Sequence, residues 1–241
     1  MSKKIDWHIG CSGFHYKEWK DTFYPKGLPA TKWFTYYNEH FNTFEINATF
    51  YRTPTLKSLL KWYSDSHADF LFSVKAPRII THYKKFQNSL QDITDFYALI
   101  SEGLQEKLSC ILFQLPPSFS YTEERLNNII TQLNPSFINV VEFRHTSWWN
   151  KDVYKAFEKN NITFCNVSYP NFPDDIIATS PIYYFRFHGV PELYRSAYSH
   201  EYLATVIKKI KTENIKSAWL YFNNTAGLGA IENANYIKSI V

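Results

Sequence analysis

Eight short segments of the chain alternate apolar and polar side chains in the same way. Successive side chains of a β-strand point to opposite faces, so each segment predicts a strand with one apolar face and one face carrying polar groups. The predicted strands are residues 7–12, 43–47, 71–75, 110–114, 140–144, 164–168, 184–188 and 219–223. The apolar faces carry Ile9/Cys11, Phe44/Ile46, Phe72/Val74, Ile111/Phe113, Val141/Phe143, Cys165/Val167, Phe185/Phe187 and Leu220/Phe222. A sheet that is apolar on one side and collects charges at the C-terminal ends of the other is typical of a closed parallel barrel.

Segments with helical periodicity separate these strands, at residues 32–41, 56–66, 93–104, 123–133, 153–159, 201–211 and 233–240. The alternation favours an α/β fold with parallel strands. The 241 residues are close to the roughly 250 typical of a TIM (β/α)8 barrel, so we expect a single TIM-barrel domain over residues 1–241. A doubly wound open sheet is the alternative, although the first strand lacks the Gly-x-Gly-x-x-Gly turn of that fold.

Composition and charge exclude only a few classes of function. The formal net charge is +4 and the lysine clusters are typical of solvated helix faces, which favours a small ligand over nucleic acid. Cys11, Cys110 and Cys165 are placed on the helix-facing side of their strands as buried thiols, which indicates a reducing compartment. No segment reaches the length of a membrane span and the N-terminus lacks a signal-peptide core, so we expect a cytoplasmic protein with no membrane contact.

Charged and amide side chains gather where the predicted strands end, which is where barrels of this type carry their functional sites. These residues are Glu45, Asn47, Lys75, Gln114, Glu142, Arg144, Arg186, His188 and Asn223. Three cations, Arg144, Arg186 and Lys75, outnumber two carboxylates and predict a pocket for a small anionic or sugar-like substrate. The alternative is a self-neutralising network that only fills the barrel, for example Glu142 with Arg186 and Glu45 with Arg144.

Glu142, Glu45 and His188 are the candidate catalytic groups, because carboxylates and imidazole transfer protons near neutral pH. Each glutamate could equally serve as the counter-ion of an arginine. His188 could instead be hydrogen-bonded into its loop, and Arg186 on the same face should keep its ring neutral. If the protein is an enzyme, these groups indicate acid/base chemistry of the hydrolase, lyase or isomerase type. We expect no metal and no cofactor, since the interleaved cations would repel a metal ion.

Aromatic residues concentrate in the loops that follow the predicted strands. Tyr16, Tyr51 and Trp148 are candidate pocket walls, whereas Trp19 and Phe23, together with Phe50, are expected to pack the loops onto the barrel. Asn47, Gln114 and Asn223 complete the candidate substrate-binding set. The same aromatics leave open a nucleotide or single-stranded nucleic-acid binding protein. A non-catalytic small-molecule sensor is the third hypothesis.

Gly227 and Gly229, with Asn223, Asn224 and Thr225, suggest a phosphate-binding loop, or phosphate cradle, at a helix N-terminus.

Several sequence blocks carry a resemblance to a known family. They are residues 9–13 (IGCSG), 23–25 (FYP), 44–52 (FEINATFYR), 72–75 (FSVK), 114–119 (QLPPSF), 142–145 (EFRH) with Ser147-Trp148, 186–189 (RFHG) and 221–224 (YFNN). Together they resemble the YecE-like family, domain of unknown function 72, over almost the full length. The resemblance implies a TIM-barrel fold and no settled activity. Family members often have a basic residue after the His-Gly pair and an aspartate after the paired asparagines, where this chain has Val190 and Thr225; Arg195 is a candidate replacement for the first.

Overall fold

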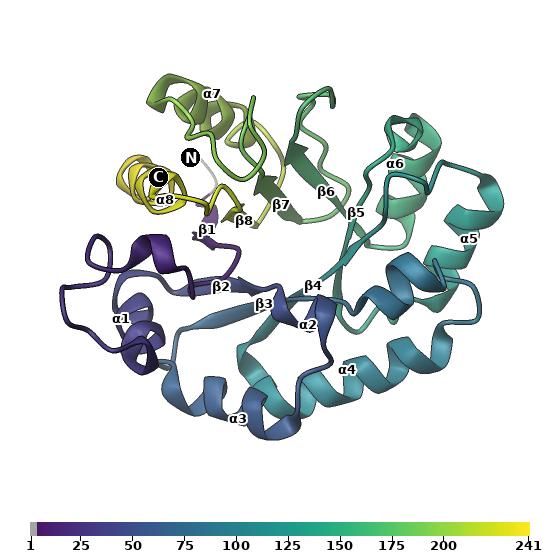
Figure 1. Cartoon of the computed structure of the whole chain (residues 1–241). Coiled ribbons are helices and arrows are strands. Elements are labelled where there is room, and N and C mark those ends of the chain that lie inside the picture. The colour runs from purple at the N-terminus through teal and green to yellow at the C-terminus, as the bar shows by residue number, and fades with distance from the viewer. Residues whose placement is uncertain (1–3) are drawn as a thin grey trace. The chain divides into compact units, whose positions relative to one another are not determined.

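The structure, a computed structural model, describes residues 4–241. The strands are β1 (Asp6–Cys11), β2 (Thr43–Ile46), β3 (Leu71–Lys75), β4 (Leu108–Gln114), β5 (Ile138–Glu142), β6 (Thr163–Ser168), β7 (Ile182–Phe187) and β8 (Ser217–Phe222). The helices are α1 (Trp33–His40), α2 (Ala48–Tyr51), α3 (Leu56–Asp65), α4 (Leu90–Leu104), α5 (Glu123–Gln132), α6 (Lys151–Lys159), α7 (His200–Ile210) and α8 (Gly229–Ile240) (Figure 1). Parallel strands alternate with helices, which confirms the predicted TIM-type (β/α)8 fold class.

Two compact units make up the chain. The first comprises the residues up to Glu45 together with Asn166–Val241, and the second is the continuous segment Ile46–Cys165. Strands β2 and β6 are therefore divided between the units. The expectation of one domain over residues 1–241 stays a prediction.

In the first unit, β8 lies between β1 and β7, and all three strands are parallel. Arg186 is the register partner of Tyr221 and Phe187 that of Phe222, so the predicted polar and apolar faces are each continuous across β7 and β8. The Phe187 and Phe222 rings stack at 4.5 Å on the apolar face. Helix α8 packs against β1, β8 and α7 (Figure 1).

Position 10 in β1 requires glycine because the backbone of Thr43 passes close to it. A Cβ atom at this position would lie 2.2 Å from the carbonyl oxygen of Thr43. Tyr37 of α1 bridges the same place, because its hydroxyl accepts from the Cys11 backbone N–H at 2.9 Å and donates to the Thr43 carbonyl at 3.1 Å. A larger residue than glycine would force these strand segments apart.

In the second unit, β3, β4, β5 and the first half of β6 are parallel neighbours. Gln114 is the register partner of Glu142 and Phe113 that of Val141, as the alternation predicts. Polar side chains begin the helices α3, α5 and α6: Thr55 accepts from Ser58 N–H, Thr122 from Arg125 N–H, and Asn150 from the N–H groups of Asp152 and Val153. Such caps satisfy backbone donors that the first helical turn leaves without partners.

The structure corrects the predicted faces of β4 and β6 for two cysteines. The register places Cys110 on the face of Leu112 and Gln114, and Cys165 follows Phe164, which pairs with Val141 on the helix-facing side. The Cys165 thiol accordingly lies 3.9 Å from Glu142 Oε2, and Cys110 shares the face of Gln114. Phe164, not Cys165, packs on Phe157 of α6. In β6 both parities mix polar and apolar residues, so alternation alone did not specify the face.

Candidate functional site

The second unit brings the predicted residues Lys75, Gln114, Glu142 and Arg144 to the C-terminal ends of β3, β4 and β5. Lys75 Nζ donates to Gln114 Oε1 at 2.9 Å and lies 4.1 Å from the centre of the Phe50 ring. Glu142 is fully buried and forms an ion pair with Nε of Arg144, whose side chain is 8% exposed. Phe50 was expected only to pack its loop; it also holds the lysine ammonium by a cation–π contact.

His82 joins this group and was not predicted from the sequence. Its ring is half-buried, packs edge-on against Phe50 at 4.8 Å and contacts Thr81 Oγ1 at 2.9 Å. Burial, and after it the nearby cations Lys75, Arg144 and Lys85, lower the pKa of His82 to about 4, and Glu142 opposes them only in part. The imidazole is therefore neutral at physiological pH in a surrounding of positive potential. We call Lys75, His82, Lys85, Glu142 and Arg144 the strand-end cluster.

The loop after β3 has an irregular backbone that positions His82 and Lys85. Residues Ile79–Tyr83 form a π-helical turn, and Lys85, Phe86 and Asn88 have positive φ angles of 50°, 61° and 51°. Gln132 of α5 holds this loop, since its amide donates to the Phe86 carbonyl and accepts from the Ser89 N–H at 3.0 Å. Strained backbone that neighbouring residues hold in place is characteristic of functional sites. Periodicity cannot reveal it, although a histidine shortly after a strand ending in lysine is a usable signal.

The first unit collects a second group, which we call the Glu45 network: Ser12, Glu45, Tyr184 and Arg186. Glu45 Oε1 accepts from Ser12 Oγ at 2.9 Å and from Arg186 Nε and Nη2 at 3.1 and 2.7 Å. Glu45 Oε2 accepts from Tyr184 Oη at 2.7 Å. Four donor groups thus bind the two carboxylate oxygens of Glu45. Both Glu45 and Arg186 are almost fully buried.

The arginine–glutamate pairs thus differ from the network considered in the sequence analysis. Glu45 pairs with Arg186 and Glu142 with Arg144, the opposite combination to the one offered there. Each pair lies within one unit. In both cases the glutamate is the counter-ion of an arginine, and in the Glu45 network both carboxylate oxygens accept hydrogen bonds.

His188 and Asn223 lie together at the ends of β7 and β8. The Asn223 amide nitrogen is 3.0 Å from His188 Nδ1, and the Asn223 backbone N–H donates to the Phe187 carbonyl at 2.8 Å. An amide NH2 group can only donate, so this contact makes Nδ1 of His188 the acceptor. His188 is fully buried, and its backbone is bonded to Ser168 and Tyr194.

The aromatic candidates differ in their burial and in their contacts. Tyr16 donates to the Ser12 carbonyl, and burial raises its pKa to about 12 within the field of Glu45 and Arg186, so the hydroxyl stays protonated beside the Glu45 network. Tyr51 is 71% exposed in α2 and packs edge-on against Phe50. Trp148 corrects our expectation of a pocket wall: it is fully buried, stacks on Phe143 at 4.0 Å and donates to the Phe119 carbonyl at 2.7 Å. Trp19 packs as expected and donates to the Gly227 carbonyl.

Two remaining candidates have structural contacts. Asn47 precedes α2, where its carbonyl accepts from the Phe50 N–H at 3.1 Å. Asn224, part of the suggested phosphate cradle, donates to the Ser196 carbonyl and to Asn233 Oδ1, both at 3.1 Å. Its amide nitrogen thus fixes the start of α8, the helix that begins at Gly229 rather than at the predicted residue 233.

Within residues 4–241, no group of three or more His, Cys, Asp or Glu side chains is arranged to hold a metal ion. In the same part of the chain, no helix has the length and apolarity needed to cross a membrane.

The sequence of the chain matches a known protein family. The profile of the family described as "Protein of unknown function DUF72" matches residues 8–241. The chain belongs to the DUF72 family. This confirms the resemblance stated from the sequence blocks, and the family's description assigns no activity.

Two bacterial proteins whose names both begin with UPF0759 are similar to this DUF72 protein in sequence. It is 30% identical over 116 residues to the "UPF0759 protein YecE" of Escherichia coli (strain K12), which covers 48% of this chain and 42% of that protein. It is 25% identical over 142 residues to the "UPF0759 protein YunF" of Bacillus subtilis (strain 168), covering 56% of this chain and 50% of that protein. The matches therefore span half or less of these relatives' lengths.

Solved DUF72 structures share the fold over nearly the whole chain. A DUF72 family protein from Thermotoga maritima MSB8 has a TM-score of 0.88 at 28% identity, covering 98% of this chain and 99% of that one. A DUF72 family protein from Enterococcus faecalis V583 has a TM-score of 0.81 at 19% identity, covering 97% and 94%. The second likeness concerns the fold alone.

Proposed function

We propose that this DUF72 protein is an enzyme that binds a small anionic substrate at the strand-end cluster and uses Glu142 to transfer a proton. The carrying observation is the charge of that cluster, where the cations Lys75, Lys85 and Arg144 stand against the single carboxylate Glu142. Partly buried cations in excess are costly unless an anion compensates them. Burial is the main cause of the low pKa of His82, and Lys75, Arg144 and Lys85 act in the same direction.

The cluster contains the groups that acid/base chemistry needs. The Arg144 guanidinium beside Glu142 favours the ionised carboxylate, which is the form a general base requires. Neutral His82 offers a second group that can accept or donate a hydrogen bond to the substrate. The reaction class is acid/base chemistry of the hydrolase, lyase or isomerase type, without metal or cofactor.

Anion binding tests the first half of the proposal. Inorganic phosphate and short carboxylates are titrated into the protein by calorimetry, and we expect Lys75→Gln to weaken the bound anion about tenfold, the value of one charge-assisted contact. Lys57→Gln is the matched control, because Lys57 is an exposed lysine on α3 of the same unit. Undiminished anion affinity in Lys75→Gln, or an equal loss in Lys57→Gln, contradicts the site.

Turnover tests the second half. Phosphorylated sugars and hydroxy acids that bind are incubated with the protein and followed by NMR, and Glu142→Gln should abolish product formation while anion binding persists. Full turnover in Glu142→Gln removes this residue from the mechanism. Binding without any chemical change would instead support the non-catalytic sensor. Burial of the Trp148 ring favours the small-anion proposal over a stacking surface for single-stranded nucleic acid.

A further inference from the structure

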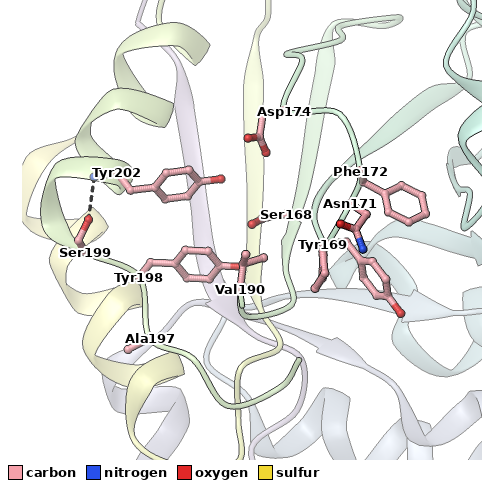
Figure 2. A pocket seen from close by; sticks show the side chains of 11 residues that line it. Ser168, Tyr169, Asn171, Phe172, Asp174, Val190, Ala197, Tyr198, Ser199 and Tyr202 are labelled. Carbon is pink, nitrogen blue, oxygen red and sulfur yellow. Dashed lines mark hydrogen bonds between the residues drawn. The ribbon is translucent and has the colours of Figure 1, made fainter. Parts of the chain in front are cut away.

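A second pocket lies in the first unit, and none of the residues that line it belongs to the strand-end cluster or the Glu45 network. It occupies about 330 Å³ between the loop after β6, Val190 in the loop after β7 and the start of α7 (Figure 2). We call it the tyrosine pocket. The side chains that define its chemistry are Ser168, Tyr169, Phe172, Asp174, Tyr198 and Tyr202. Ser168 was predicted to face the polar side of its strand with the other strand-end residues; here it faces α7.

The tyrosine pocket carries one charge, and that charge is negative. Asp174 lines it, whereas within residues 4–241 no lysine, arginine or histidine does. In Figure 2 the Tyr198 and Tyr202 rings reach from the α7 side toward Ser168 and Asp174, while Tyr169 and Phe172 lie on the loop after β6. Burial raises the pKa of both tyrosines, and Asp174 contributes in the same direction, so both hydroxyls stay neutral at physiological pH. The lining thus combines one carboxylate, hydroxyl oxygens and aromatic rings.

Buried asparagines hold both walls in place. Asn233 of α8 accepts from the Tyr198 N–H and donates to the Tyr198 carbonyl, both at 2.9 Å. Asn166 does the same for Ile177, which follows the loop that carries Asp174, at 2.9 and 2.8 Å. The Tyr198 and Tyr202 rings stack at 5.3 Å. A pocket with walls fixed in this way loses little conformational entropy when a ligand enters.

We propose that the tyrosine pocket binds a small primary amine as its ammonium ion. An ammonium group has three N–H donors, and the pocket presents the Asp174 carboxylate together with the hydroxyl oxygens of Ser168 and Tyr202 as acceptors. An anion would meet the Asp174 charge without any cation to offset it. The aromatic rings of Tyr169 and Phe172, which pack edge-on at 5.1 Å, provide an apolar surface for the amine's carbon chain.

Calorimetry at neutral pH tests this site with n-butylamine, which is protonated there, and with 1-butanol, its neutral counterpart of similar shape. We expect n-butylamine to bind at least tenfold more tightly than 1-butanol. Asp174→Asn should abolish that difference, and Tyr202→Phe, which keeps the ring, should weaken n-butylamine several-fold. Asp175→Asn makes the same change of charge one residue away, outside the lining, and should leave n-butylamine affinity unchanged.

Equal affinity for n-butylamine and 1-butanol would overturn the proposal, as would the absence of n-butylamine binding at millimolar concentration. An Asp175→Asn variant that loses as much affinity as Asp174→Asn would also overturn it, since the effect would then be general surface electrostatics. Asp174 is solvent-exposed, so Asp174→Asn is expected to unfold at the same temperature as the unsubstituted protein.

Discussion

The two units place the same residue types, a glutamate and an arginine, where their strands end, yet the surroundings of the two pairs differ. In the Glu45 network a serine and a tyrosine join Arg186 in donating hydrogen bonds to the carboxylate. In the strand-end cluster two lysines accompany Arg144, and the positive charge exceeds the negative. A buried pair that is neutralised by its own partners contributes structure, whereas the excess charge of the other pair is the basis of the anion site we propose. The difference therefore separates a scaffold from a candidate site more clearly than the residue types do.

Breaking the Glu45 network should have the largest effect on stability. Glu45→Leu leaves the Arg186 guanidinium buried without its carboxylate, so we expect the free energy of unfolding in urea to fall by about 3–5 kcal/mol. The double variant Glu45→Leu/Arg186→Met removes both charges and should recover most of that loss. A loss of less than about 1 kcal/mol for the single change would show that the network is not the structural element described here.

Removing one donor from the same network should have a smaller effect. Tyr184→Phe deletes the hydroxyl that donates to Glu45 Oε2 at 2.7 Å and retains the ring. Hydrogen bonds to charged groups contribute about 1.5–3 kcal/mol, which is the expected loss in unfolding free energy. Tyr51→Phe removes an exposed hydroxyl and serves as the control. Equal stabilities of the two variants would contradict the assignment.

The third prediction concerns the charge excess of the strand-end cluster and has the smallest effect on stability. His82 has a pKa of about 4, below its ordinary 6.5, so the unfolded chain binds its proton first as pH falls. The contribution of His82 to stability is therefore present above pH 6.5, declines between 6.5 and about 4, and is constant below. Proton NMR of the His82 ring, assigned with His82→Gln, measures this pKa directly. Saturating phosphate should raise it, and an unliganded value near 6.5 would refute the positive surroundings.

Alternation predicted the fold well because most strands have one parity that is uniformly apolar. Gln114 and Glu142 pair on the face where the pattern placed them, and Arg186 shares a face with Tyr221. In β6, both parities are mixed, and Cys165 accordingly came out on the other face. His82 depends on a π-helical turn that Gln132 holds from a distant helix, which no local pattern encodes.

The sequence also could not predict which charged side chains form ion pairs with one another. The pattern brings two arginines and two glutamates to strand ends, but which arginine reaches which glutamate depends on side-chain geometry and on donors such as Ser12 and Tyr184. Trp148 was misassigned for a related reason, since its loop position resembles a pocket wall until Phe143 and Phe119 are seen to enclose the ring.

The pairing of β1 with β8 sets an order of events during synthesis. Asp6 is the register partner of Ser217, so β1 has no β8 neighbour until residues 217–222 have been translated. The second unit is continuous and can complete its internal contacts once Cys165 has emerged. Limited proteolysis of stalled nascent chains should therefore show protection of residues 46–165 before residues 6–11. Strand β1 is thus made well before β8, the strand with which it pairs.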